Sequence, residues 1–224
     1  MEKNDFLELK NFDSEDIDDV LVKIEKSYGF KFEKHELINV KTFGELCDII
    51  VKKLNRANVP DCTTQQAFYK LRNAIYGMRY VGEISPATEL DKIFPRQSRI
   101  YEIKQVEALL GFSLNLLHPK SWVTSALIYM LLISIVVIFF KWQPGLCGIM
   151  VSIFGFNISN KLGKEFELKT AGQVAEKMSR EYYLRSRRKP ATVNRIEVEE
   201  KIRDLFAHDL DLNYSALTRE AKFV

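Results

Sequence analysis

The feature that most constrains this chain is an uncharged apolar run from Trp122 to Phe140. A helix that crosses a bilayer needs about 20 consecutive apolar residues, and this run has about that length. A helix in a soluble core normally keeps a polar face, whereas this run is apolar on every face. The run lies in the middle of the chain, so it is not a cleaved signal peptide. The sequence therefore predicts an integral membrane protein whose first transmembrane span covers residues 121–140.

A second apolar stretch, Leu146–Ile158, follows a segment that contains Trp142 and Pro144. That segment has the composition of a helix-stopping turn at a membrane interface. The second stretch is short for a span, but extended to about residues 142–159 it can cross the bilayer and form a helical hairpin. The alternative is a re-entrant or interfacial segment.

Basic residues at the ends of these stretches favour the hairpin, because cytoplasmic flanks are enriched in Lys and Arg. Both long ends of the chain are then cytoplasmic, and two crossings satisfy that arrangement. We expect a protein of the cytoplasmic (inner) membrane with both termini in the cytoplasm. Arg96, Arg99, Lys104 and Lys120 precede the first span, Lys161, Lys164 and Lys169 follow the second, and only Lys141 lies in the turn.

The residues that usually carry chemistry are isolated. The cysteines lie far apart with no C-x-x-C spacing, so neither a disulfide framework nor a metal site is predicted. No H-E-x-x-H, G-x-S-x-G or Gly-rich phosphate loop accompanies the histidines, so we expect no catalytic residue and no enzyme. The residues concerned are Cys47, Cys62, Cys147, His35, His118 and His208.

Outside the apolar stretches the hydrophobic periodicity and the capping residues predict an all-α chain. We expect one helix to begin at Asp13 or Ser14 and a fourth to begin within Ser85–Glu89. The other expected helices are Thr42 to Leu54, Gln65 to Tyr76, Arg99 to Leu110, Thr170 to Arg185 and Arg195 to His208.

Two segments together carry a family resemblance. Asp13–Phe32 reads D-S-E-D-I-D-D-V and continues to K-I-E-K-S-Y-G-F-K-F, and Val40–Ile50 reads V-K-T-F-G-E-L-C-D-I-I. They resemble the Asp-Ser-Leu motif, the acidic helix and the last helix of acyl carrier proteins. The resemblance covers roughly residues 12–54, but the family's first helix is missing before it.

The opposite end of the chain supplies a candidate for the missing helix. Residues 195–224 resemble the opening helix and loop of an acyl carrier protein. Glu167–Met178 also repeats the last-helix motif, since Lys41-Thr42 and Lys169-Thr170 both begin the pattern Lys-Thr-x-Gly. We therefore expect a split carrier-like fold, in which the C-terminal helix packs beside the N-terminal helices of its own chain or of a second copy.

These expectations define a domain layout. Carrier-like helices 2 to 4 occupy residues 1–56, a helical linker domain occupies 57–119, and the transmembrane hairpin occupies 120–160. The C-terminal cytoplasmic helices occupy 161–224. The expected fold is a small acyl-carrier-like helical bundle with a transmembrane helical hairpin.

The resemblance implies that Ser14 receives a 4'-phosphopantetheine arm, whose thiol holds an acyl chain as a thioester. It also implies that acidic residues after Ser14 dock a basic partner by electrostatic steering. Glu15 departs from the family, which has Leu there. In the alternative interpretation Ser14 is only a helix N-cap and the protein carries no cofactor. The acidic residues are Asp13, Asp16, Asp18, Asp19 and Glu25.

Two further segments suggest interactions. A basic cluster near the C-terminal helix either contacts anionic lipid headgroups or forms a solvated linker. Thr63–Arg72 has the apolar stripe of a packed helix and too little charge for nucleic acid, so no nucleic-acid partner is expected. The basic cluster comprises Arg185, Arg187, Arg188 and Lys189.

Taken together, the sequence predicts a non-catalytic, membrane-anchored acyl-carrier-like adaptor that presents an acidic helix to enzymes of acyl or lipid metabolism. Its expected partners are membrane lipids and those enzymes. The alternative is a membrane scaffold or regulatory protein with no prosthetic group, whose helical ends pair with a partner or with another copy.

Overall fold

The computed structural model describes residues 14–33 and 35–223, and this part of the chain is mostly helical, as predicted. It divides into two compact units. Unit 1 comprises Met1–Lys70 and Val174–Val224, and unit 2 comprises Leu71–Gln173. Unit 1 is thus assembled from segments that lie on both sides of unit 2 in the sequence. Residues 57–119, expected as a separate linker domain, are shared between the two units.

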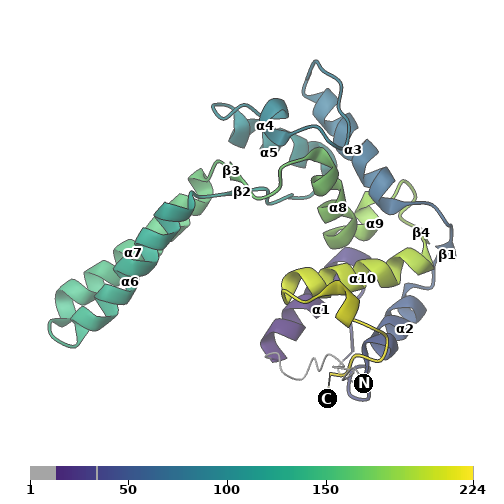
Figure 1. The fold of residues 1–224 in the computed structure, drawn as a ribbon, viewed down its shortest axis with the longest axis horizontal. Helices are drawn as coiled ribbons and strands as arrows, with labels where there is room; N and C mark the ends of the chain where they lie inside the picture. The colour runs from purple at the N-terminus through teal and green to yellow at the C-terminus, as the bar shows by residue number, and fades with distance from the viewer. Residues whose placement is uncertain (1–13, 34, 224) are drawn as a thin grey trace, which may run out of the picture. The chain divides into compact units, whose positions relative to one another are not determined.

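Figure 1 shows the elements in chain order. The helices are α1 (Ser14–Tyr28), α2 (Phe43–Leu54), α3 (Thr63–Gly77), α4 (Leu90–Ile93), α5 (Arg99–Leu110), α6 (Ser121–Ile138), α7 (Trp142–Leu162), α8 (Ala171–Glu181), α9 (Tyr183–Ser186) and α10 (Arg195–Asp209). Strand β1 (Ala57–Asn58) pairs in parallel with β4 (Thr192–Val193), and β2 (Leu117–His118) pairs antiparallel with β3 (Glu165–Phe166).

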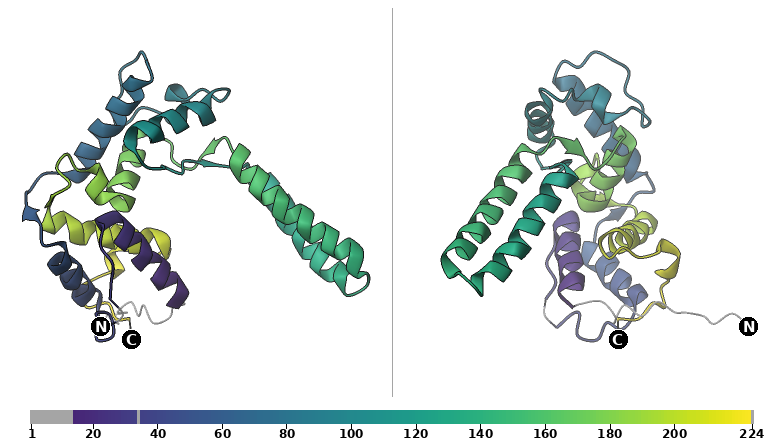
Figure 2. Two further views of the ribbon diagram at one scale, coloured as in Figure 1. Left: turned by 180° about the vertical axis from the view of Figure 1, so that it is seen from behind. Right: turned by 60° about the vertical axis from the view of Figure 1, so that its left-hand side comes forward.

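Helix α10 completes the N-terminal helices of the same chain. In unit 1, α1, α2 and α10 pack around one hydrophobic core, to which α9 and the C-terminal segment also contribute (Figures 1 and 2). The ring of Phe206 lies edge-on to Phe43, with 5.5 Å between the centroids, and 6.1 Å from the ring of Phe223. The core therefore contains side chains from both ends of the sequence. Its most buried members include Val20, Ile24, Tyr28, Phe43, Leu46, Ile50, Val198, Ile202, Leu205 and Phe206.

Backbone hydrogen bonds join the C-terminal segment to the start of α2. Thr42 caps α2 in a capping box with Glu45, and Thr42 forms a β-bridge with Lys222. A Cβ at Gly44 would lie 2.9 Å from the carbonyl oxygen of Arg219, so this approach requires glycine. The hydrogen bonds run from Phe43 N–H to Ala221 O (2.8 Å), from Gly44 N–H to Arg219 O (2.9 Å) and from Phe223 N–H to Lys41 O (2.9 Å).

Unit 2 repeats this junction at the start of α8. Thr170 and Gln173 exchange the same capping hydrogen bonds, and Thr170 forms a β-bridge with Glu89. A Cβ at Gly172 would lie 2.9 Å from the carbonyl oxygen of Pro86. The matching hydrogen bonds run from Ala171 N–H to Thr88 O (2.9 Å), from Gly172 N–H to Pro86 O (2.8 Å) and from Leu90 N–H to Lys169 O (2.9 Å). The Lys-Thr-x-Gly repeat thus marks one structural junction that occurs in both units.

A second motif also recurs in the two units. Helix α1 ends because Gly29 adopts a φ of +67°, and α5 ends where Gly111 adopts a φ of +79°. Four residues before each glycine, a glutamate accepts a hydrogen bond from a backbone N–H seven residues further on. These bonds are Phe32 N–H to Glu25 Oε1 (2.7 Å) and Leu114 N–H to Glu107 Oε1 (2.5 Å). The hairpin α6–α7 follows this motif in unit 2, where unit 1 has only the loop that leads to α2.

Helices α6 and α7 lie side by side as a hairpin (Figure 2). Small residues of α7 face α6: a Cβ at Gly148 would lie 2.1 Å from Ser134 Oγ, and one at Gly155 would lie 2.6 Å from Leu127 Cδ2. The hydroxyl of the buried Ser134 donates to the carbonyl oxygen of Met130 (2.7 Å), so it leaves no unsatisfied donor. Such close contact through small residues is the usual packing between helices in a bilayer.

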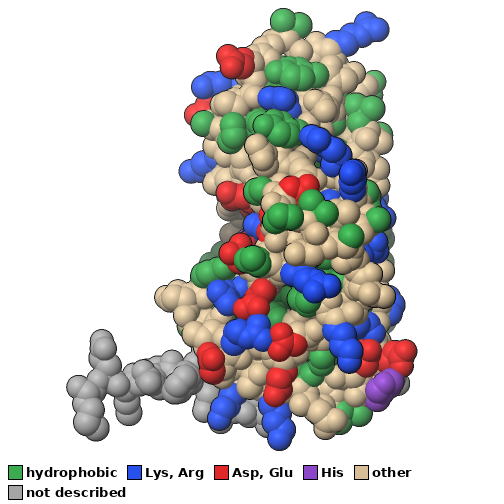
Figure 3. All heavy atoms as spheres, turned by 90° about the vertical axis from the view of Figure 1, so that its right-hand side faces the viewer, with side chains coloured by type: hydrophobic (Ala, Val, Ile, Leu, Met, Phe, Trp, Pro, Cys, Tyr) green, Lys and Arg blue, Asp and Glu red, His purple; other side chains and the backbone are tan. Residues whose placement is uncertain are grey.

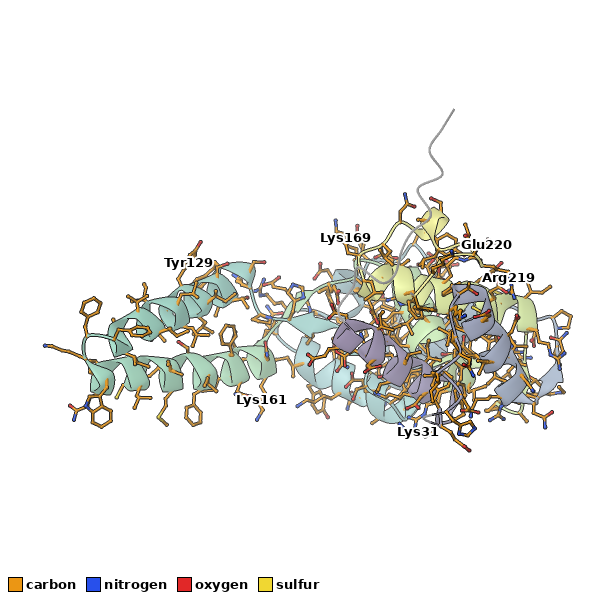
Figure 4. All side chains as sticks on the ribbon, turned by 90° about the horizontal axis from the view of Figure 1, so that it is seen from below. Lys31, Tyr129, Lys161, Lys169, Arg219 and Glu220 are labelled. Carbon is orange, nitrogen blue, oxygen red and sulfur yellow. The ribbon has the colours of Figure 1, made fainter. Side chains whose placement is uncertain are left out.

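The outer surface of the hairpin is apolar and exposed. Within the described residues, α6 and α7 are the two helices long and apolar enough to cross a membrane. In the most apolar 18-residue segment of each helix, only 6% of α6 and 11% of α7 is buried within the protein. The core helix of a soluble protein, in contrast, is mostly buried. Figure 4 shows the side chains of both helices, among them Tyr129, pointing outward.

Several predicted boundaries were wrong, one for a local reason and two because of contacts with residues distant in the sequence. Pro144 lies in the first turn of α7 and does not stop a helix, since a first-turn N–H has no helical partner to lose. Ser85–Thr88 forms a turn instead of a helix start, because the carbonyls of Pro86 and Thr88 accept hydrogen bonds from α8. The helix expected over Thr170–Arg185 breaks before Tyr183, whose N–H donates to Ser27 Oγ (2.9 Å).

The packing of α10 gives a direct test. Phe206→Ala should lower the free energy of unfolding of unit 1 by about 3–5 kcal/mol, because it removes a buried ring between Phe43 and Phe223. Denaturant unfolding of the full-length protein in detergent measures this change. The matched control is Ile196→Ala on the same helix, where the side chain is 78% exposed and the change should be small. Equal effects of the two substitutions would contradict the core position of Phe206.

Candidate functional site at the start of α1

An apolar groove of about 180 Å³ opens beside the first turns of α1. Ile17 and Leu21 are one helical turn apart and share the face of α1 that borders the groove. The loop before α2, α2 itself and the C-terminal segment form the other walls, so residues from both ends of the sequence build the groove. The lining residues are Ile17, Asp18, Leu21, Leu37, Val40, Leu46 and Phe223.

Ser14, the predicted attachment residue, is the first residue of α1. It precedes Ile17 by three residues, so its backbone lies on the side of the helix that borders the groove. The side chain of Ser14 and the whole of Asp13 lie outside the described residues. Of the residues that line the groove, Asp18 alone was predicted as a site residue, and only the resemblance of the C-terminal segment to a carrier loop could have indicated Phe223.

The acidic face predicted on α1 is present in part. Asp16, Asp18 and Asp19 are exposed, and so is Glu15. Like charges on one exposed helical face create a negative potential that steers a basic partner. The same charges also complement the positive end of the helix dipole.

Glu25 does not belong to this acidic face, which corrects the prediction. Its side chain is almost fully buried, and its carboxylate accepts hydrogen bonds from Lys31 Nζ (2.5 Å) and from the N–H of Phe32 (2.7 Å). Burial on its own would raise the pKa of Glu25, but these two hydrogen bonds outweigh it and hold the pKa below its usual range. Glu25 therefore fixes the turn after α1 and does not face a partner.

Unit 2 has no equivalent of this groove wall. Counting from the matching glutamates Glu25 and Glu107, Arg96 takes the place of Ser14, and Arg99 takes the place of Ile17. Arg99 is buried: its guanidinium lies 4.2 Å from the centroid of the Phe166 ring and donates to the carbonyl oxygen of Phe94 (3.0 Å). A buried cation thus stands in unit 2 where unit 1 has an apolar side chain lining a groove.

The basic cluster needs a second correction, because Arg187 is fully buried and cannot reach a lipid headgroup. Arg187 pairs with Asp61, donates to Thr63 Oγ1 (2.7 Å) and lies 3.7 Å from the Glu197 carboxylate. Arg187 and these partners join α10 to the start of α3. The buried guanidinium is tolerated there because the partners accept its hydrogen bonds and balance its charge. Arg185, Arg188 and Lys189 are exposed.

No group of three or more potential metal ligands occurs within the described part of the chain. His35 and His208 are exposed, and His118 is half-buried in β2. On the face drawn in Figure 3, basic and acidic side chains are interspersed.

No family model, no curated protein and no solved structure matches this chain.

The hydrogen bonds of Glu25 predict a dependence of stability on pH. Because the pKa of Glu25 is lower in the folded protein than in the unfolded chain, the stabilisation is present above the unfolded value of about 4.5 and is lost as the pH falls through the folded value. Glu25→Gln should reduce the free energy of unfolding at pH 7 and flatten the decrease of that free energy as the pH falls below about 4.5. Denaturant titrations measure both effects. Glu220→Gln, an exposed carboxylate labelled in Figure 4, is the control and should change neither.

Cysteine reactivity provides a further check on the core of unit 1. Cys47 is buried in α2, and burial raises the pKa of its thiol to about 12, whereas Cys62 is exposed. A water-soluble maleimide should therefore label Cys62 in the native protein and reach Cys47 only after unfolding, since the thiolate is the reactive form. Mass measurement of single-cysteine variants tests this. Labelling of Cys47 and Cys62 at similar rates in the native state would exclude the packing of α2 described above.

Proposed function

We propose that this protein is a membrane-anchored, acyl-carrier-like adaptor that is not itself an enzyme. Unit 1 is the carrier-like head, and the hairpin α6–α7 is the anchor. The observation that carries the proposal is the apolar groove that opens beside the exposed first turn of α1, next to an acidic helical face.

The apolar exterior of the hairpin supports the anchor. Large apolar side chains exposed along two adjacent helices form a surface that water solvates poorly and lipid solvates well. Trp122 and Trp142 are 69% and 64% exposed near the two ends of the hairpin, where aromatic belts of membrane proteins lie.

The assembly of unit 1 supports a topology with both ends on one side. Segments before and after the hairpin share one hydrophobic core, so the chain crosses the bilayer an even number of times. By the positive-inside rule, the basic residues that flank the hairpin favour a cytoplasmic position for this side, so the cytoplasmic (inner) membrane is the proposed location.

The residues at the groove fit a phosphopantetheine arm on Ser14. The arm supplies a thiol that holds an acyl group as a thioester. Ile17, Leu21 and Leu46 offer an apolar wall that shields the first methylene groups of such a chain from water, and about 180 Å³ accommodates a short chain segment. Ser14 begins the helix whose next turn forms this wall, so an arm attached there lies within reach of the groove.

The acidic residues of α1 define the proposed docking surface. Asp16, Asp18 and Asp19 are exposed beside the groove, and Asp18 also lines it. A partner enzyme of acyl or lipid metabolism with a basic patch would be steered to this face and would meet the acyl group there.

Glu15 favours the second candidate function, a membrane scaffold or regulator without a prosthetic group. Acyl carrier proteins have leucine at this place beside the modified serine, whereas Glu15 is exposed and charged. In a scaffold, Ser14 is the first residue of α1 and carries no arm, so the function tolerates its replacement by alanine.

Intact-mass measurement of the protein extracted from its native membranes distinguishes the two candidates. A carrier gains about 340 Da, the mass of the arm, and loses this gain in Ser14→Ala but not in the control Ser215→Ala, an exposed serine of unit 1. An unmodified mass in the wild-type protein would exclude the carrier mechanism and leave the scaffold.

A further inference from the structure

A second groove, of about 470 Å³, lies at the base of the hairpin within unit 2. Apolar side chains of α6 and α7 line one part of it, including Val123, Leu127, Ile158 and Leu162. The other part is polar and lies just outside the two helices, where Arg96, Lys120 and Lys164 line it together with Glu165. The groove is therefore apolar along the hairpin and basic at the hairpin's end.

The surrounding backbone holds this groove in shape. Strands β2 and β3 pair directly before α6 and directly after α7, with His118 opposite Glu165. Gly163 packs so closely on this pair that a Cβ there would lie 2.5 Å from the carbonyl carbon of His118. Gly155 contributes no side chain to the groove. The backbone next to Lys120 and Lys164 is thus held by paired strands at one end of the groove.

The charges in the groove are unequal. Three basic side chains face one carboxylate, and that carboxylate is already paired, because Arg96 Nη2 lies 2.5 Å from Glu165 Oε1. Neither Lys120 nor Lys164 forms an ion pair with a carboxylate among residues 14–33 and 35–223. Lys120 also precedes the start of α6, where the helix dipole adds positive potential. An anion is the ligand that this end of the groove favours.

The position of the groove identifies the kind of anion. In a bilayer, its apolar part lies among acyl chains, and its basic part lies at the depth of the headgroups, close to the exposed Trp122. Lys161, labelled in Figure 4, adds a further cation at the same end of α7. A ligand that fills both parts has an apolar tail and a negatively charged head. Basic pockets between transmembrane helices bind lipid headgroups in this way.

We propose that this groove binds one anionic phospholipid of the cytoplasmic leaflet, with its phosphate at Lys120 and Lys164 and an acyl chain along Leu127 and Ile158. The proposal rests on the membrane placement given above but not on the carrier role of Ser14. It involves residues of unit 2 alone and is independent of the basic cluster around Arg188.

Native mass spectrometry of the full-length protein in detergent tests the site with two defined lipids, phosphatidylglycerol and phosphatidylcholine. We expect wild-type protein to retain phosphatidylglycerol in preference to phosphatidylcholine. The double variant Lys120→Gln/Lys164→Gln should bind phosphatidylglycerol roughly 30-fold more weakly. Lys141→Gln/Lys169→Gln removes the same charge outside the groove and should bind like the wild type.

A second pair of variants tests the apolar part without any change of charge. Val123→Trp fills the groove and should reduce retention of phosphatidylglycerol, whereas Val151→Trp, at a 58% exposed position of α7, should not. Unchanged retention in the lysine variant and in Val123→Trp would overturn the site, and so would equal retention of the two lipids. Release of the wild-type protein from membranes by alkaline carbonate would instead refute the membrane placement, and the lipid site with it.

Discussion

The structure of unit 1 depends on the contact between the two ends of the chain. The ring of Phe206 packs on Phe43, and the strand-like segment before Phe223 bonds to the first turn of α2. Without α10, helices α1 and α2 would expose to water the apolar side chains that now pack on it. Neither helix is long enough to be stable without such packing. The groove beside α1 exists only because the C-terminal segment forms one of its walls. Every proposed function of α1 therefore depends on residues at the far end of the sequence.

The two units share two structural motifs but differ in the residues and loops next to them. In each unit, a glycine in the first turn of a capped helix, Gly44 or Gly172, lets another backbone segment pack closely on it. In each unit a glutamate, Glu25 or Glu107, also accepts a hydrogen bond from the turn after its helix. They differ within the helix that precedes this turn, where unit 1 has Ile17 in α1 and unit 2 has Arg99 in α5, stacked on Phe166. They also differ in the loop that follows, which in unit 2 contains the hairpin. Unit 1 thus has an apolar groove beside α1, whereas unit 2 has the apolar hairpin with a groove at its base.

Charged residues in this protein have to be judged by burial and not by charge alone. Glu25 and Arg187 belong to sequence patterns that suggest interaction surfaces, yet both are buried and bonded to their own chain. A buried charge costs free energy unless it is paired, so partners such as Lys31 and Asp61 are part of the fold. Asp16, Asp18 and Asp19, by contrast, are exposed and available to a partner.

The sequence by itself determined the elements whose signals are local. The apolar hairpin helices, the Thr42 cap, the end of α1 at Gly29 and the bounds of α5 all follow from composition, capping and backbone preference within a few residues. The tertiary structure alone decided what depends on distant neighbours: Tyr183 breaks a helix by bonding to Ser27, and Arg187 is buried among Asp61, Thr63 and Glu197. It also decided the walls of both grooves, because residues far apart in the chain meet there only after the backbone has closed its long-range hydrogen bonds.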